Sequence, residues 1–415
     1  MRAATLGPPT STPATPTGPL LSDQARRAGS SAIRDLLAQA SRPGMISLAG
    51  GIPDATRFPT DELADIARRV IATDGVGALQ YGRTEGTDEC RAVLSTHLGF
   101  DDPESLLITT GAQQGLTLTV RALINPGDRV IVSEAEYVGM LQVLQAHGAV
   151  PVAIPADHDG LDTEHLADLL ASGARPKACY LVPHFHNPTG ATIAADRWAH
   201  LGELSARYGF VVIEDDPYRD LYFDDEPPTV VHTDPDLTVH LRSTSKSLAP
   251  GLRVGVVRAP HDVHRAMVTA KQSLDLHTST LGQAIVCEAV RASWYPEHLA
   301  QLRASYSRKC GVLRTEIDRA LADRIDTMNA PGGGMFLWVG FTEPIETEPW
   351  LGRALDQGVC FVPGGAFSPT GGLPSSARFS FATASEGELV EAVRRLAASL
   401  PTGSARHGSA TLKPG

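Results

Sequence analysis

The sequence has little of what a disulfide scaffold, a zinc site or a membrane protein needs. Its five cysteines are odd in number and scattered, and no two of them form a CxxC pair. That pattern argues against both a disulfide framework and a metal site. No apolar run approaches the ~20 residues that span a bilayer, and the N-terminus lacks the apolar segment of a secretory signal. We therefore expect a soluble, cytoplasmic protein without a membrane partner.

Clustered positive charge is also missing. Acidic residues outnumber Lys and Arg by 47 to 36, and the formal net charge is −11. Proteins that bind nucleic acid use groups of Lys and Arg to neutralise phosphates, so we expect no nucleic-acid partner. The 415 residues, 42% of them hydrophobic and 20% charged, have the composition of an ordinary globular protein. This is enough chain for one large and one smaller domain.

Strand-like and helix-like segments alternate through the middle of the chain. The strand candidates are DRVIVSE, ACYLVPHF, FVVIEDD, LTVHLRSTS and RVGVVRAP. They are unbroken apolar runs, which are typical of parallel strands covered on both faces. Helical stretches such as TEHLADLLASGA lie between them, so the sequence predicts an α/β fold with a mostly parallel central sheet flanked by helices. After about Trp294 a long helical stretch and then short strands predict a smaller α+β domain.

These patterns divide the chain into five segments. The two ends are rich in Pro, Thr, Ala and Gly and cannot bury enough apolar surface to offset their ordering entropy. The predicted segments are a disordered N-terminal segment over 1–21, a segment over 22–60 that joins the small domain, a large cofactor-binding domain over 61–295, a small C-terminal domain over 296–400 and a disordered tail over 401–415.

Four short motifs follow predicted strands, where the chemical residues of an α/β sheet are expected. They are GAQQG at 111–115, HNPTG at 186–190, EDDPY at 214–218 and STSK at 243–246. Each is weak alone, because a Lys in a Ser/Thr run is usually a solvated loop residue and an Asp pair after a strand is usually a helix cap. Together they supply what a cofactor with an aldehyde, a phosphate and a ring nitrogen requires.

The aldehyde and the ring of such a cofactor find partners in these motifs. Lys246 offers an amine for the aldehyde and is flanked by hydroxyls rather than carboxylates. A buried Asp215 would stabilise the protonated ring nitrogen. Asn187 and Tyr218 would donate to the ring hydroxyl, and Tyr137 in EAEYVG is a stacking partner for the ring.

The phosphate of the cofactor needs several donors. The backbone amides of Ala112 and Gln113 stand at a predicted helix start, which favours anions. The hydroxyls of Ser243 and Ser245 and the guanidinium fork of Arg253 complete the predicted set.

The motifs HNPTG, EDDPY and STSKSLAPGLRVG, with the late ARFSFA, resemble those of the fold-type-I aminotransferases of classes I and II. The resemblance is to the branch that contains 2-aminoadipate and kynurenine aminotransferases and the aminotransferase-like domain of MocR regulators. It runs from about Ser31 to Leu400, and the spacing from Asp215 to Lys246 fits. It implies PLP fold type I with pyridoxal 5'-phosphate as the cofactor.

The resemblance also implies an activity. The enzyme would exchange the α-amino group of an amino acid with a 2-oxo acid through a Schiff base on Lys246. Lys246, Asp215 and Tyr218 would be the catalytic residues. The residues implied to hold the cofactor are Ala112, Gln113, Tyr137, Asn187, Asp215, Tyr218, Ser243, Ser245, Lys246, Arg253 and Tyr81.

For the substrate, the resemblance implies that Arg378 binds the α-carboxylate as a bidentate pair, with Gly51 and Asn187 beside it. Tyr81, in LQYGRTEG, matches a tyrosine that reaches the phosphate across a dimer interface, so we expect a homodimer with shared active sites. Arg26, Arg27 and Arg34 precede the small domain and are candidates for binding a distal carboxylate. The alternative, charges on a solvated helix, is favoured for each.

Two departures from the family pattern leave other functions open. His186 stands where the branch usually has Gln, and Thr244 stands in a usually aromatic position of the lysine motif. The alternative function is non-transaminase PLP chemistry on an amino acid in a biosynthetic pathway: β/γ-elimination or replacement, cyclisation, decarboxylation or oxidation. A third hypothesis is a non-catalytic, effector-binding domain of a regulator.

Several residues also have plainer interpretations. For Glu214 and Asp216, beside Asp215, the plainer interpretation is a surface or cap carboxylate, and it is favoured for Glu214. Arg378 has the alternative of a surface arginine at a strand end. His184 and His186 have the i, i+2 spacing of half a metal site on one strand face, but no third ligand is evident, so we predict no metal.

Overall fold

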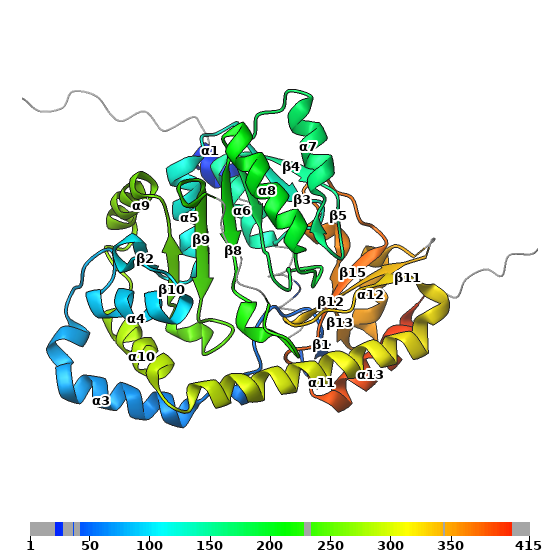
Figure 1. Ribbon diagram of the computed structural model, residues 1–415. Helices are drawn as coiled ribbons and strands as arrows, with labels where there is room; N and C mark the ends of the chain where they lie inside the picture. The colour runs from blue at the N-terminus through cyan, green and yellow to red at the C-terminus, as the bar shows by residue number, and fades with distance from the viewer. Residues whose placement is uncertain (1–20, 28–35, 37–41, 228–233, 343–344, 401–415) are drawn as a thin grey trace, which may run out of the picture.

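The computed structural model describes residues 21–27, 36, 42–227, 234–342 and 345–400 (Figure 1). The two terminal segments predicted to be disordered lie outside these residues, apart from Leu21. In the described part of the chain, no helix combines the length and the apolar character that crossing a membrane requires.

A seven-stranded sheet with the order β2-β10-β9-β8-β7-β3-β4 forms the centre of the molecule. Every pair in it is parallel except the two pairs that β10 makes, with β2 and with β9. The predicted mostly parallel sheet is therefore confirmed. Its strands are β2 (Leu106–Thr109), β3 (Arg129–Ser133), β4 (Val150–Ile154), β7 (Ala178–Leu181), β8 (Val211–Asp215), β9 (Thr238–Ser243) and β10 (Gly255–Arg258).

One predicted strand runs the other way from its neighbours. The segment RVGVVRAP contains β10, which was expected to be parallel and is antiparallel. The connection from β9 to β10 covers only residues 244–254 and contains no α-helix. A parallel crossover needs a dozen or more residues, so the chain returns beside β9. Lys246 and Arg253 lie in this return and are therefore held at one end of the sheet.

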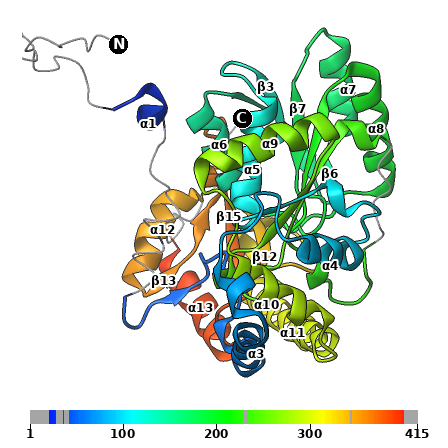
Figure 2. The ribbon, with the colours of Figure 1, turned by 90° about the vertical axis from the view of Figure 1, so that its left-hand side faces the viewer.

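Helices cover both faces of the sheet, as Figure 2 shows. Val130 and Val132 of β3 belong to one hydrophobic core with helices α5 and α6, whereas Ile131 belongs to a second core with helices α7 and α8. This alternation explains why the strands are apolar without interruption. The covering helices are α5 (Ala112–Leu123), α6 (Val138–His147) and α9 (His261–Leu274) on the first face, and α7 (Thr163–Ala171) and α8 (Ala195–Tyr208) on the second.

A third core packs against β2 and β10 at the edge of the sheet. It is built by α3 (Thr60–Leu79), α4 (Asp88–Leu98) and α10 (Thr280–Arg291). Side-chain caps begin two of these helices, because Thr87 accepts a hydrogen bond from the Cys90 amide and Ser279 accepts one from the Gly282 amide. Capping of this kind satisfies amides that the first turn leaves unpaired.

The long helix α11 (Tyr295–Leu321) leads from this region to a second, four-stranded sheet (Figure 1). That sheet has the order β11-β12-β15-β14 and packs with two helices and the N-terminal strand β1, which pairs in parallel with β13. The domain boundaries themselves stay a prediction. The elements are β1 (Ile46–Ser47), β11 (Ile325–Met328), β12 (Phe336–Phe341), α12 (Thr347–Asp356), β13 (Val359–Cys360), β14 (Val362–Pro363), β15 (Ser376–Ser380) and α13 (Glu386–Ser399).

Candidate active site

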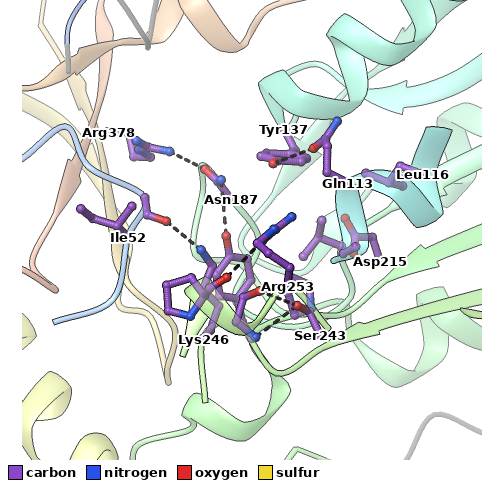
Figure 3. Close-up of a pocket in the computed structure, with 17 residues that line it drawn as sticks. Ile52, Gln113, Leu116, Tyr137, Asn187, Asp215, Ser243, Lys246, Arg253 and Arg378 are labelled. Atoms are coloured by element: carbon purple, nitrogen blue, oxygen red, sulfur yellow. Dashed lines mark hydrogen bonds between the residues drawn. The ribbon is translucent and has the colours of Figure 1, made fainter. Parts of the chain in front are cut away.

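A cavity of about 400 Å³ lies at the carboxyl ends of the central strands, where residues of the second sheet reach it (Figure 3). Every predicted cofactor and substrate residue lines it except Tyr81. The size suits a cofactor with a small substrate. The lining residues are Gly51, Ile52, Ala112, Gln113, Leu116, Tyr137, Val182, Asn187, Asp215, Pro217, Tyr218, Ser243, Ser245, Lys246, Pro250, Arg253 and Arg378.

Lys246 carries the nucleophile of this cavity. Its Nζ donates a hydrogen bond to the carbonyl oxygen of Gly51 at 2.8 Å. The pKa of Lys246 is lowered from 10.5 to about 8, mostly by burial and also by the positive charges of Arg378 and Arg253, against the opposite effect of Asp215. The amine thus loses its proton far more readily than a solvated lysine, as a nucleophile or a base requires.

Asp215 ends β8 inside the cavity wall. The hydroxyl of Tyr180 donates to its Oδ2 at 3.0 Å, whereas its buried Oδ1 has no hydrogen-bond partner among the described residues. The pKa of Asp215 is raised to about 7, mostly by burial and also by the charges of Asp216 and Glu136, against the opposite effect of the Tyr180 hydrogen bond. A positively charged N–H donor at Oδ1 would satisfy this oxygen. A protonated ring nitrogen is such a donor, so the site fits a pyridine ring.

The two carboxylates beside Asp215 are not surface or cap residues, and that interpretation is wrong. Glu214 and Asp216 are buried. Glu214 Oε2 lies 2.9 Å from His240 Nδ1. Asp216 forms an ion pair with Arg242, and its Oδ2 lies 2.9 Å from His184 Nδ1. Burial alone would raise the pKa of Asp216, but Arg242 and His184 bring it below its usual value. Because β8 is covered on both faces, successive side chains are all enclosed.

The two histidines of the supposed half metal site do not share a strand face. They follow β7, which ends at Leu181, and each faces a different carboxylate. His184 pairs with Asp216, while His186 Nε2 lies 3.1 Å from Glu136 Oε1. The two histidines therefore belong to two separate buried pairs, and their i, i+2 spacing does not bring them to one metal site.

An anion site forms where α5 begins. Gly111 precedes the helix with a φ of 77°, and the first two helical residues, Ala112 and Gln113, line the cavity. The hydroxyls of Ser243 and Ser245 lie 2.9 Å apart, and Arg253 Nη2 donates to the Thr110 carbonyl at 3.1 Å. Helix amides, hydroxyls and a guanidinium together match the needs of a phosphate.

Two tyrosines present protonated hydroxyls. Burial raises the pKa of Tyr137 to about 12, and burial raises the pKa of Tyr218 as well. The Tyr137 hydroxyl donates to Gln113 Oε1 at 3.1 Å. Asn187 Nδ2 donates to the Tyr218 hydroxyl at 3.5 Å. Both phenols therefore stay neutral donors at physiological pH.

Arg378 reaches the cavity from β15 and is not a surface arginine, since only 1% of it is exposed. Its Nη1 donates to Asn187 Oδ1 at 2.7 Å and its Nη2 to the Ala49 carbonyl at 2.5 Å. The guanidinium carbon lies 4.4 Å from the Phe336 ring centre and 4.9 Å from that of Phe367. Burial lowers the Arg378 pKa to about 10, which leaves the group charged at neutral pH. Figure 3 shows it on the opposite side of Lys246 from Ser243.

Three predicted or candidate residues among those that the structure describes do not lie at the cavity. Tyr81 has 78% of its surface exposed and makes an edge contact with the His277 ring, with 5.7 Å between centroids. Arg26 and Arg27 belong to the short helix α1 (Asp23–Arg27) and do not line the cavity. Arg34 lies outside the described residues.

Sequence reasoning missed three residues that shape the site. Ile52 lines the cavity with 54% of its surface exposed. Tyr180 holds Asp215, and its signal was a single polar aromatic within the apolar run ACYLV. Glu136 is completely buried and directly precedes Tyr137. Its position next to a predicted site residue was the one feature of the sequence that could have identified it.

Comparisons with known proteins point to one family. The family model for aminotransferase class I and II matches residues 43–396. A 2-aminoadipate transaminase of Thermus thermophilus is 36% identical over 91% of this chain and 95% of its own length. An aromatic-amino-acid aminotransferase of Thermococcus litoralis is 33% identical over 91% of this chain and 93% of its own length.

A solved structure shares the fold as well. It is the alpha-aminoadipate aminotransferase of Thermus thermophilus, complexed with N-(5'-phosphopyridoxyl)-L-leucine. The TM-score is 0.85 at 35% identity, over 91% of this chain and 96% of that chain. The resemblance drawn from the motifs is confirmed.

Proposed function

Because the chain belongs to the class I and II aminotransferase family, we propose that the cavity described above is its cofactor and substrate site. The chain is a pyridoxal-phosphate-dependent aminotransferase, which exchanges the α-amino group of an amino acid with a 2-oxo acid. One observation carries the assignment of the site. Lys246 lines the same cavity as Asp215, whose buried Oδ1 has no hydrogen-bond partner among the described residues.

We propose that the anion site at the start of α5 holds the phosphate. The amides of Ala112 and Gln113, the hydroxyls of Ser243 and Ser245 and the Arg253 fork are its donors. All five residues line the cavity, and together they offer more donors than a carboxylate would need. Tyr81 of a neighbouring subunit would add one hydroxyl.

The remaining polar residues hold the ring. Asp215 keeps the ring nitrogen protonated by its negative charge, Tyr218 and Asn187 donate to the ring oxygen, and Tyr137 stacks on the ring. When bound, pyridoxal 5'-phosphate supplies an aldehyde that takes up the amino group and a ring that withdraws electrons from the substrate Cα. Asp215 and Tyr218 act on the ring, and Lys246 acts on the aldehyde and on the substrate.

Lys246 is the proposed base. Its amine would hold the cofactor, and the same amine would accept and return the Cα proton of a bound substrate. A pKa of about 8 allows Nζ both to accept and to return a proton near neutral pH. Gly51 orients this amine through its carbonyl, at 2.8 Å. Arg378 and Asn187 hold the α-carboxylate, which fixes Cα near Nζ.

We propose substrates with uncharged aliphatic or aromatic side chains. Among the described residues that line the cavity, the positive charges are those of Lys246, Arg253 and Arg378, and each already has a proposed partner in the cofactor or the α-carboxylate. The apolar Ile52 follows Gly51 and is half exposed. We propose that the side chain of the substrate packs against it. The aromatic-amino-acid aminotransferase among the relatives supports this choice.

We also propose a homodimer in the cytoplasm. The support for the dimer is that the apolar side chains of Val76, Leu79 and Leu276 are exposed in the same region as Tyr81. The support for the cytoplasm is that all five cysteines are buried free thiols, as a reducing compartment allows.

Two measurements test the proposal. Borohydride reduction of the yellow holoenzyme, followed by peptide mapping, should place the reduced cofactor on Lys246, and an adduct on another lysine would refute the site. A panel of amino acids should convert the cofactor to pyridoxamine phosphate and release 2-oxo acids, with the highest kcat/KM for aliphatic or aromatic side chains. Preference for acidic side chains would show that the substrate assignment is wrong.

A further inference from the structure

Behind the cavity wall, His186 and Glu136 form a buried pair that none of the roles proposed above uses. Glu136 is completely buried, and only 6% of His186 is exposed. The imidazole Nε2 lies 3.1 Å from Glu136 Oε1. His186 stands in the HNPTG motif, at the position where the resembling branch usually has Gln.

The hydrogen bonds of Glu136 determine where the imidazole proton lies. Glu136 Oε1 accepts from the Tyr137 amide at 2.7 Å, and Oε2 accepts from the Ser133 amide at 3.1 Å. A carboxylate only accepts, so the short contact to His186 requires a proton on Nε2. On the other side of the ring, Nδ1 lies 2.8 Å from the Thr189 hydroxyl, which can donate or accept. The ring is therefore fixed at both nitrogens.

The carboxylate connects His186 to the proposed stacking residue. Tyr137 is held at its backbone amide by Glu136 and at its hydroxyl by Gln113. Its ring also lies close to Gly139, where an added Cβ would approach the ring atoms to 2.5 Å. Of these three restraints, only the one through Glu136 fixes the turn from which the side chain departs.

His186 also joins two loops that follow neighbouring parallel strands. The loop after β3 contains Glu136 and Tyr137, and the loop after β7 contains His186 and Asn187. His186 is anchored in its own loop, because its amide donates to the Ala191 carbonyl at 2.8 Å and its carbonyl accepts from the Gly190 amide at 2.6 Å. The pair thus sets the distance between the stacking residue and Asn187, which binds Arg378.

We propose that His186 is a positioning residue of this aminotransferase, which acts through Glu136 to hold Tyr137 against the cofactor ring. The inference rests on the stacking role proposed for Tyr137. Removal of the imidazole would leave a fully buried carboxylate short of one donor, which is costly. A cavity of about 20 Å³ lies beside His186, so water has room to enter, and the Glu136 side chain would turn towards it and release the Tyr137 amide.

The experiment compares His186→Ala with His186→Gln. The readouts are the dissociation constant of pyridoxal 5'-phosphate from the apoenzyme and the visible circular dichroism of the bound cofactor, which reports how the ring is held. We expect His186→Ala to weaken binding on the order of tenfold and to reduce the dichroic band. His186→Gln should restore both, because its amide can donate to Glu136. Should His186→Ala not fold, Glu136→Gln has to show the same reduced band.

Two controls separate positioning from general destabilisation. His240→Gln removes a histidine from a similar buried pair, with Glu214 at 2.9 Å, that does not line the cavity. It should lower the melting temperature without changing either readout. Wild-type values for His186→Ala, or equal losses for His240→Gln, would overturn the positioning role. Tyr137→Ala shows which proposal fails: if it changes neither readout, the stacking role itself is wrong, and if it alone changes both, only the role of His186 is wrong.

Discussion

Asp215 has to be negatively charged where the protein disfavours charge. It is buried beside two further carboxylates, and in the apoenzyme this environment raises its pKa to about 7. The same unpartnered oxygen that makes the charge costly makes the site receptive to a ring N–H⁺. The buried carboxylate of Asp215 thus both destabilises the empty site and increases its affinity for the cofactor.

This cause predicts how Asp215→Asn alters the stability of the apoenzyme. A folded-state pKa of about 7 against an ordinary value of 3.8 means that wild-type stability is complete below pH 4 and is lost as the pH rises through 7. Asn carries no charge and avoids this loss. The apo variant should therefore exceed the wild type by up to about 4 kcal/mol in unfolding free energy near pH 8 and match it near pH 4.

Denaturant unfolding of both apoproteins across this range checks the prediction, and a gap that does not depend on pH would contradict it. Asp216→Asn is the control. It leaves Arg242 buried without its carboxylate, so it should destabilise the protein at every pH. In the holoenzyme, Asp215→Asn should still attach the cofactor but lose turnover, because the ring nitrogen is no longer kept protonated.

Lys246 gives a second prediction at the scale of the residue. Only the neutral amine attacks the cofactor aldehyde, and the pKa of Lys246 is about 8 instead of 10.5. The rate of cofactor attachment to the apoenzyme should therefore rise with pH up to about 8 and then level off. Arg378→Gln removes one positive charge that lowers this pKa, so its profile should level off at higher pH. Stopped-flow absorbance measures both, and a wild-type rate that still rises near pH 10 would contradict the prediction.

Contiguous motifs made most site residues predictable, whereas contacts across strands were not visible in the sequence. Lys246, Asp215 and Asn187 each stand in a short run that follows a strand, so their meeting at one sheet edge was foreseeable. Glu136 reaches His186 from a separate loop, and no local spacing announces that contact. For the same reason Glu214, which faces His240 on the adjacent strand, was misjudged as a surface carboxylate.

At the scale of elements, the strands were predictable and their directions less so. Apolar runs identified β3, β7, β8 and β9, which are buried on both faces. Strand β4 was missed because Pro151 interrupts its run, and an edge strand tolerates proline since one side of it needs no ladder hydrogen bonds. The direction of β10 depends on the length of its connection rather than on its composition.

The junction of β2 and α5 supports a prediction about Gly111. This residue has a φ of 77°, and an added Cβ would lie 2.3 Å from Arg253 Nη2. Gly111→Ala should therefore strain the helix start and displace the guanidinium fork. We expect the affinity of the apoenzyme for pyridoxal 5'-phosphate to fall at least tenfold, and that for pyridoxal, which lacks the phosphate, to change little.

Gly209→Ala is the matched control for this prediction. Gly209 also has a positive φ, of 71°, but an added Cβ would meet nothing within 4 Å. It follows α8, away from the cavity, so the variant should lose stability without losing affinity for either ligand. Equal losses for pyridoxal and its phosphate in Gly111→Ala would mean that the α5 start does not hold the phosphate.

Several large apolar side chains are exposed around the end of α3 and after α9. Val76, Leu79 and Tyr81, at the end of α3, are 81%, 67% and 78% exposed, and Leu276, after α9, is 53% exposed. The two segments are joined, since the Tyr81 ring contacts His277 and the Thr280 hydroxyl donates to the Ala78 carbonyl at 2.8 Å. A monomer rarely leaves such a group uncovered, so a second copy is the expected cover.

A shared site gives this dimer a functional signature. Tyr81 lies outside the cavity of its own chain, so its hydroxyl serves the phosphate of the partner if it serves one at all. A mixture of Tyr81→Phe and Lys246→Ala subunits then forms hybrid dimers in which one site carries both lesions and the other carries neither. The assay is run at limiting cofactor, where a weakened phosphate site is most apparent. After subunit exchange, the activity of the mixture should exceed the mean of the activities of the two variants measured separately. Activity that stays at the mean of the two would place Tyr81 outside the partner's site, and the exposed surface around it would then need another explanation.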